Sequence, residues 1–91
     1  MIVRLPASLS KNGKPGMIDV EVTAGATLRA VLDEVEKRIP GATAKLLDAD
    51  GKPHRFVNMY VNGDDIRFSA GVDTPVAERD EVLILPAISG G

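Results

Sequence analysis

The sequence predicts an α+β domain in which one main helix packs across a mixed sheet of four or five strands. Apolar residues recur at every second position over 18–23 and then at helical spacing over 27–39. A further apolar run, over 81–85, has the character of a final strand. A helix that follows an opening pair of strands must lie across the sheet to bury its apolar stripe, so the domain has two layers.

The composition favours one small domain that binds proteins. Ninety-one residues suffice for one modest core and leave little room for a deep active-site cleft. The formal net charge is −2 at pH 7 and both signs are spread along the chain. This argues against a nucleic-acid or membrane-binding patch and mildly favours a basic or neutral partner surface. The chain has no cysteine, which excludes disulfides, thiolate metal ligands and cysteine nucleophiles.

No targeting or membrane segment is evident. Residues 1–5 begin strand-like alternation, without the basic and then apolar pattern of a signal peptide. No apolar run approaches the ~20 residues that span a bilayer. We therefore expect a cytoplasmic protein that is a monomer when free.

The opening elements follow from local patterns. Residues 1–5 are expected to form the first strand, which ends at Pro6 because proline has no amide hydrogen for a sheet. Residues 7–16 hold two turn signals and are expected to form a loop. The alternation over 18–23 predicts the second strand, with Val20 and its apolar partners on the buried face.

The main helix is predicted over 28–39. Thr27 is expected to cap its first turn by accepting an amide hydrogen with the hydroxyl group, and Pro40-Gly41 to end it. The opposite face, with Glu36 and its acidic neighbours, is expected to be solvated. The apolar stripe consists of Leu28, Val31, Leu32, Val35 and Ile39.

The second half of the chain alternates short elements and turns. A short helix or turn is expected over 42–47, followed by a loop over 48–53. The two aspartates of this loop lack the further ligands of a calcium site, so no metal site is expected. A third strand is predicted over 56–61 and a tight hairpin at Asn62-Gly63.

The last elements lead to the end of the chain. Ile66 and Phe68 are expected to lie in a short fourth strand or extended segment. Val72 and Val76 are expected to reach the core from the connection that follows. The last strand is predicted over 81–85.

No catalytic group is recognisable in this body. His54, the sole imidazole, has no nucleophile or orienting carboxylate at a recognisable spacing. The serines lack the G-x-S-x-G context of an activated nucleophile, and no phosphate-binding glycine motif is present. We therefore expect that the chain is not an enzyme.

An exposed apolar cluster is predicted on the outer face of the sheet. Side chains alternate along a strand, so if Val57, Met59 and Val61 face the helix, Phe56 and Tyr60 point away from it. Such a cluster usually marks a partner site. In the alternatives, a loop covers the cluster, or a register shifted by one residue swaps the faces. Leu83 and Leu85 join Phe56 and Tyr60 in the predicted partner-binding cluster.

The end of the chain reads Leu85-Pro86-Ala87-Ile88-Ser89-Gly90-Gly91. Gly90 and Gly91 have no β-carbon and can enter a channel too narrow for other residues. The reactive group so presented is the α-carboxylate of Gly91, a poor electrophile that a partner would have to activate. In the alternative, the glycines simply fray. We expect a folded domain over 1–86 and a flexible tail over 87–91, in which Ile88 contacts the partner and Ser89 is a small spacer.

Two segments resemble the sulfur carriers of the MoaD/ThiS family, which are relatives of ubiquitin. One is the ending, residues 80–91, and the other is H-R-F-V-N-M-Y-V-N with D-I-R-F-S, in residues 54–69. The second segment is similar to the carriers of cysteine biosynthesis within that family. Leu85 stands where the molybdopterin carriers commonly have an aromatic residue, which mildly supports the cysteine type. The resemblance implies the ubiquitin-like β-grasp fold.

The resemblance also implies a chemistry for Gly91. An E1-like adenylyltransferase and sulfurtransferase would use ATP to activate its carboxylate, and a sulfur donor would convert it to a thiocarboxylate. A pyridoxal-phosphate cysteine synthase would take up the sulfur, and a JAMM-type zinc metalloprotease would release the product. ATP, pyridoxal phosphate and zinc are thus expected on partner enzymes only, and no cofactor on this chain. Because the sequence ends at the diglycine, no processing is expected before activation.

Other functions remain open. A carrier for molybdopterin, thiamin or a thiosugar would share the chemistry and differ in the sulfur acceptor. A ubiquitin-like protein modifier or interaction module would have the same fold without sulfur chemistry.

Overall fold

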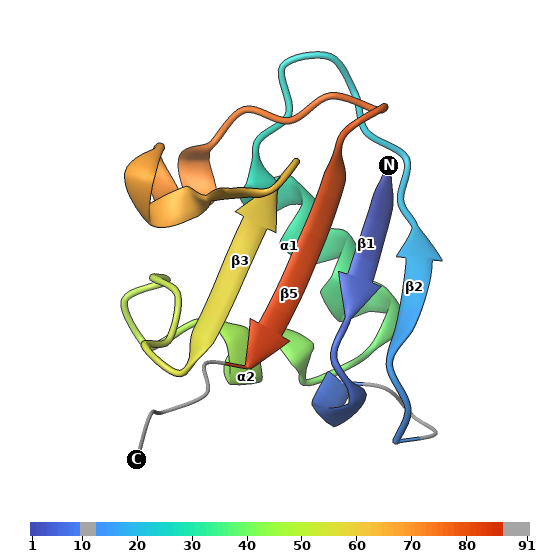
Figure 1. The fold of residues 1–91 in the computed structure, drawn as a ribbon, viewed down its shortest axis with the longest axis vertical. Coiled ribbons are helices and arrows are strands. Elements are labelled where there is room, and N and C mark those ends of the chain that lie inside the picture. The colour runs from blue at the N-terminus through green and yellow to red at the C-terminus, as the bar shows by residue number, and fades with distance from the viewer. Residues whose placement is uncertain (10–12, 87–91) are drawn as a thin grey trace.

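The sheet is built around its last strand. In the computed structural model, which describes residues 1–9 and 13–86, five strands lie in the order β2-β1-β5-β3-β4, and α1 crosses one face of the sheet (Figure 1). β5 pairs in parallel with β1 and antiparallel with β3, while the two outer pairs are antiparallel. The predicted α+β class and mixed sheet are confirmed. The strands are β1 (Ile2–Leu5), β2 (Gly16–Asp19), β3 (Val57–Val61), β4 (Asp64–Asp65) and β5 (Glu81–Pro86).

β2 lies earlier in the chain than the predicted second strand. Leu5 pairs with Gly16 and Ile2 with Asp19, so the ladder includes only the start of the alternating segment. Val20 continues the pairing through two backbone hydrogen bonds with Met1, and pairing runs out there because β1 does. The predicted faces are correct: Val20 is buried, and its apolar partners Ile18 and Val22 pack against the core.

α1 (Leu28–Arg38) buries the predicted stripe, with Ile39 as its half-buried C-cap. The predicted side-chain cap is wrong, because the Thr27 hydroxyl accepts no capping hydrogen bond. The amide of Leu28 instead donates to the backbone carbonyl of Thr74 (2.9 Å). A contact with a distant segment thus satisfies one amide of the first turn, although not one that an N-cap hydroxyl would reach. Thr74 directly follows the 3₁₀ turn η3 (Gly71–Asp73), which packs against α1.

The short helix α2 (Ala42–Leu46) forms where the sequence predicts it. Glu36 is more than a solvated side chain, because its carboxylate accepts the amides of Gly41 (2.7 Å) and Thr43 (2.9 Å). These two backbone hydrogen bonds lower the pKa of Glu36 below its ordinary value, with the Gly41 bond the larger cause. The acidic face of α1 therefore holds the start of α2 in place.

The predicted hairpin turn is confirmed, and the predicted fourth strand is wrong. Asn62 and Gly63 have positive φ angles of 53° and 86°, and β4 follows with two residues. The segment Ile66–Phe68 is not extended and forms a 3₁₀ turn, η2. The Asp65 side chain accepts the amide of Arg67 (2.9 Å), which curls the chain and buries Ile66.

One core fills the space between the sheet and the helices. Val72 and Val76 reach it as predicted. Residues that are almost fully buried come from α1, α2 and three strands, and include Leu28, Leu32, Leu46, Met59, Val3, Val82 and Ile84.

Candidate functional site

β5 is paired on both edges in its first half, and its end is paired with β3. β1 pairs with Glu81, Val82 and Leu83, and β3 pairs with the strand from Val82 to Pro86. Pro86, the last described residue, is still in register with Val57. A tail that continues from Pro86 therefore leaves from a central strand whose last residues are anchored by β3. The predicted tail residues Ile88, Ser89, Gly90 and Gly91 lie outside the described residues.

The predicted outer face is correct for β3 and β5. Val82 and Ile84 are buried under α1, whereas Leu83 is half-buried and Leu85 is 41% exposed. Tyr60 lies opposite Leu83 in the antiparallel register, so the two share the face that α1 does not cover. Tyr60, Leu83 and Leu85 therefore form the apolar centre of that face.

Phe56 lies just before β3, in a crevice that Leu85 also lines. β3 begins only at Val57, so strand alternation does not determine where Phe56 points. Its ring is 58% exposed and lines a crevice with Lys45 of α2. The Arg55 guanidinium lies over this ring, 5.0 Å from the centroid, which is the geometry of a cation–π contact. Phe56 extends the apolar surface toward α2 instead of across the sheet.

Leu85 and Pro86 form a ridge with a crevice on each side. The crevice toward β2 has a volume of about 470 Å³, and the one toward α2 about 120 Å³. Met17, 58% exposed, lines the first, and sequence reasoning missed it because it precedes the predicted second strand. Both crevices are lined mainly by apolar side chains from segments distant in sequence, including Pro6, Leu9, Pro15, Leu46, Phe56 and Leu83.

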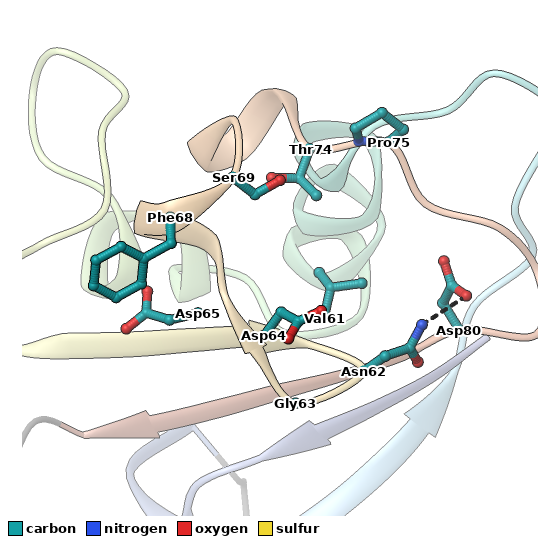
Figure 2. A pocket seen from close by; sticks show the side chains of 10 residues that line it. All are labelled: Val61, Asn62, Gly63, Asp64, Asp65, Phe68, Ser69, Thr74, Pro75 and Asp80. Carbon is teal, nitrogen blue, oxygen red and sulfur yellow. Dashed lines mark hydrogen bonds between the residues drawn. The ribbon is translucent and has the colours of Figure 1, made fainter.

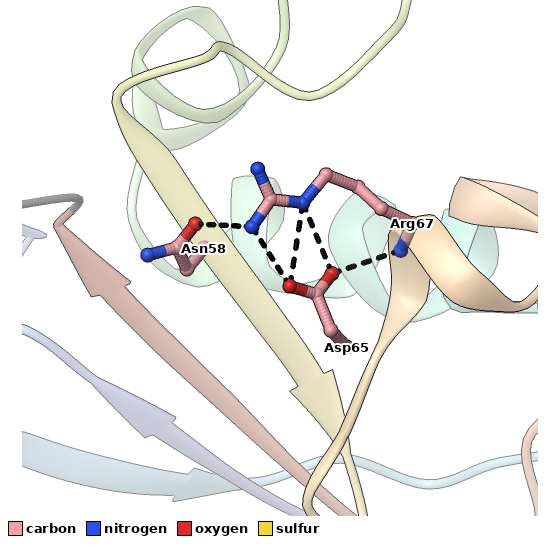
Figure 3. A network of polar contacts seen from close by, with 3 residues as sticks. All are labelled: Asn58, Asp65 and Arg67. Carbon is pink, nitrogen blue, oxygen red and sulfur yellow. Dashed lines mark hydrogen bonds and ion pairs between the residues drawn. The ribbon is translucent and has the colours of Figure 1, made fainter.

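A polar network lies beside the outer face (Figure 3). Arg67 binds Asp65 through Nε (3.2 Å) and Nη2 (2.8 Å), and Nη2 also donates to Asn58 Oδ1 (3.1 Å). These contacts lower the pKa of Asp65 and raise that of Arg67, in each case chiefly through the side-chain hydrogen bond between them. Asn58 lies opposite Leu85, so the network fixes a guanidinium at the border of the apolar face.

A hollow of about 590 Å³ lies at the other end of the sheet, around the β3–β4 turn (Figure 2). Asp64, Asp65 and Asp80 line it, and the exposed ring of Phe68 (90%) stands at its edge. The Thr74 hydroxyl in this hollow donates to the Gly71 carbonyl (2.6 Å), so no carboxylate takes its proton as a catalytic base would.

The described residues contain neither a candidate metal site nor a membrane-spanning helix. In residues 1–9 and 13–86, no group of three or more acidic or histidine side chains is placed to hold a metal ion. Within the same residues, no helix has the length and apolar character needed to cross a membrane.

Known proteins with similar sequences are small sulfur carriers and modifiers. A family model described as "ThiS family" matches residues 4–91. The sulfur carrier protein CysO of Mycobacterium tuberculosis is 49% identical over 70 residues, which is 75% of this chain and 75% of that protein. Small archaeal modifier protein 3 of Haloferax volcanii is 31% identical over 75 residues, covering 81% of this chain and 75% of that protein.

A solved structure shares the fold. The crystal structure of the Amycolatopsis orientalis BexX/CysO complex contains a chain that matches with a TM-score of 0.83 and 38% identity. The match covers 99% of this chain and 98% of that one. The matching chain thus comes from a crystal structure of a complex between two proteins.

Proposed function

We propose, since this chain belongs to the ThiS family and is a sulfur carrier protein of the CysO type, that it carries sulfur as a thiocarboxylate on Gly91. The observation that carries the proposal is the family match, which extends through the diglycine to residue 91. The resemblance of this sequence to the MoaD/ThiS family and the predicted β-grasp fold are confirmed by the same comparisons.

The anchored strand supports the proposal physically. β5 holds Pro86 in register with β3, so the body can stay outside a partner while the residues after Pro86 enter it. Five extended residues reach about 17 Å at about 3.4 Å each, which suffices for a buried active site. The apolar face of Tyr60, Leu83 and Leu85, with Phe56 next to it, would dock the body, and Ile88 would add a contact within the tail.

The chemistry takes two steps on a partner enzyme. A Gly91 carboxylate oxygen attacks the α-phosphorus of ATP, and pyrophosphate leaves to give an acyl-adenylate. Hydrosulfide then attacks the carbonyl carbon, and AMP leaves with the former carboxylate oxygen. The product is a C-terminal thiocarboxylate, in which one sulfur has replaced one oxygen. This chain is the protein substrate of both steps and supplies no catalytic side chain.

The sulfur acceptor that fits best is a pyridoxal-phosphate cysteine synthase, because the similarity is to CysO proteins. A metalloprotease of the JAMM type would then release the amino acid from the carrier. Molybdopterin, thiamin and thiosugar pathways remain rivals with the same activation chemistry. Incubation of the thiocarboxylate form with each acceptor enzyme, followed by mass spectrometry of the small product, separates them.

The decisive experiment is an intact-mass measurement. With an E1-like adenylating enzyme, ATP and sulfide, the wild-type mass should rise by about 16 Da, the difference between sulfur and oxygen in the thiocarboxylate. Deletion of Gly91 should abolish this gain and leave the melting temperature unchanged, because a single terminal glycine adds little stability. The control variant Lys37→Ala, on the exposed side of α1, should gain mass like the wild type.

Two results would contradict the proposal. One is no gain in mass with an adenylating enzyme that modifies a CysO control protein, and the other is full gain by the Gly91 deletion. A large loss of stability in the deletion would show that the tail is part of the fold.

A second candidate is a protein modifier, favoured by the 31% identity to small archaeal modifier protein 3. In that case the activated carboxylate would be attacked by a lysine amine and form an isopeptide bond. The same reaction without sulfide and with cell extract would then yield covalent conjugates, seen as higher-mass species that contain this chain. A carrier would yield no such conjugates in this reaction, and would yield the thiocarboxylate when sulfide is supplied.

A further inference from the structure

The charges that line the hollows differ between the two ends of the sheet. Among the described residues, the crevice toward β2 is lined by Arg4 and the crevice toward α2 by Lys45, and neither is lined by a carboxylate. The hollow at the opposite end is lined by three aspartates and by no cation. The end from which the tail leaves is thus cationic, although the chain as a whole has a net charge of −2.

The cations near the tail root differ in how they are paired. Arg4 binds Glu81 at 2.6 Å, and Arg67 binds Asp65 at 2.8 Å, so their charges are largely compensated. Lys45 Nζ contacts only the Ser8 carbonyl, at 3.4 Å, among described partners. The Arg55 guanidinium lies over the Phe56 ring and has no ion pair with a described carboxylate. Lys45 and Arg55 therefore remain available to a carboxylate of another protein.

These cations adjoin apolar surface on the same side of the ridge. Lys45 and Phe56 line one crevice together, and Arg55 covers part of the Phe56 ring. Leu85 forms the wall that this crevice shares with the crevice toward β2. An apolar centre with charged groups at its margin is the usual composition of a protein–protein interface.

We propose that this end docks on an acidic protein surface, in which carboxylates surround an apolar projection that fills the crevices beside Leu85. The inference rests on the proposed function, because the surface belongs to the enzyme that takes up the tail. Carboxylates of that enzyme would face Lys45 and Arg55, and its projection would contact Leu85 and Phe56. The net charge of the whole chain favours a basic or neutral partner, and the placement of the charges reverses that expectation.

The electrostatic part of this docking acts mainly on the rate of association. Opposite charges at the margin of an interface steer the encounter and raise the association rate constant, and salt screens the effect. The cationic end would lead into the complex and the three aspartates of the far hollow would face away. The tail, which starts at the cationic end, would thereby arrive at the channel first.

The test compares two charge-reversed variants with the same net charge. Lys45→Glu/Arg55→Glu alters the tail end, and Lys37→Glu/Arg79→Glu alters exposed positions that line neither crevice. Association with the immobilised adenylating enzyme is followed by surface plasmon resonance at about 0.05 M and about 0.5 M salt. Circular dichroism confirms that both variants are folded.

The first variant should associate about tenfold more slowly than the wild type at low salt, and the difference should shrink at high salt. The second variant should associate like the wild type, or faster. Equal slowing of both variants, no slowing of the first, or no measurable association of the wild type would overturn the inference. The wild type could gain about 16 Da, as the thiocarboxylate requires, while the two variants associate at the same rate. That result would contradict this inference and leave the proposed function intact.

Discussion

Asn62 has two functions in the turn after β3. Its backbone is left-handed, with φ 53°, a conformation that costs most residues about 1 kcal/mol or more. Its side chain donates to Asp80 (2.9 Å) and accepts the amide of Glu81 (2.9 Å), which ties the turn to the start of β5. The residue therefore contributes both a backbone angle and a cross-link.

Two substitutions separate these contributions. Asn62→Gly keeps the angle and loses both hydrogen bonds, so it should lower the free energy of unfolding by about 1 kcal/mol. Asn62→Ala loses the bonds and also strains the backbone, so the loss should be about 2 kcal/mol. Urea denaturation of the three proteins measures both values. A glycine variant no more stable than the alanine variant would refute the backbone contribution.

Asp80 makes the free energy of unfolding depend on pH in the acidic range. Its carboxylate accepts hydrogen bonds from Asn62 and from the amide of Ala77 (2.8 Å), and these lower its pKa below 3.8, with the Asn62 bond the larger cause. A carboxyl group whose pKa is lower when folded stabilises the fold above its unfolded pKa, and this stability is lost as the pH falls through the folded value.

The free energy of unfolding should thus fall below about pH 4, and less steeply in Asp80→Asn than in the wild type. Urea denaturation between about pH 2 and pH 6 tests this. The variant should keep part of the slope, because the pKa values of Asp65 and Glu36 are lowered too. Identical slopes in the two proteins would contradict the assignment to Asp80.

At the level of elements, Thr74 links η3 to the start of α1. Its hydroxyl accepts the amide of Ala70 (3.2 Å) and donates to the Gly71 carbonyl (2.6 Å), while its backbone carbonyl accepts the Leu28 amide. The residue is 7% exposed, and it lines the hollow around the β3–β4 turn. One hydroxyl group therefore adds two hydrogen bonds to the connection before β5.

Thr74→Val keeps the shape of the side chain and removes the hydroxyl, so it should lower the free energy of unfolding by about 1–3 kcal/mol. Thr74→Ser keeps the hydroxyl and should lose less. Thermal and urea denaturation measure both variants. A valine variant as stable as the serine variant would show that these hydrogen bonds contribute little.

The elements also show where sequence reasoning succeeds. The hairpin at Asn62-Gly63 and the inward residues of β3 and β5 were predicted correctly, because short-range preferences and strand alternation determine them. The strand expected over 66–68 was wrong because the Asp65 side chain accepts the amide of Arg67, a local contact that turns the chain. The hydroxyl cap at Thr27 was wrong too, and the start of α1 is instead held by the carbonyl of the distant Thr74. Interactions between segments far apart in sequence leave no local pattern.

At the scale of the molecule, the docking surface was predicted only in part. Tyr60, Leu83 and Leu85 share a face because alternation fixes it. Phe56 shares the crevice toward α2 with Leu85, and Met17 lines the crevice toward β2 although no pattern marked it. The two crevices and their cations arise where β5, α2 and the β1–β2 connection meet, so only the assembled fold shows them. The predicted Gly91 site remains a prediction.

β5, the strand that leads to the tail, should be harder to open than the edge strand β2. β5 is paired on both edges and buries Val82 and Ile84, whereas β2 lies at an edge and its residues are mostly exposed. An interior strand with a buried face opens only when the whole domain unfolds, while an edge strand opens locally. The tail should therefore be attached to a strand that opens only when the whole domain unfolds.

Native-state hydrogen exchange tests this order of stability. The amides of Leu83 and Ile84 should exchange with the free energy and the urea dependence of global unfolding, and those of Met17 and Ile18 with lower free energies and little urea dependence. The Gly91 deletion should leave both groups unchanged, since neither depends on the tail. If the β5 amides exchanged by local opening, the tail would be attached to a strand that yields before the domain does, and the body could not hold the tail in place while a partner acts on its end.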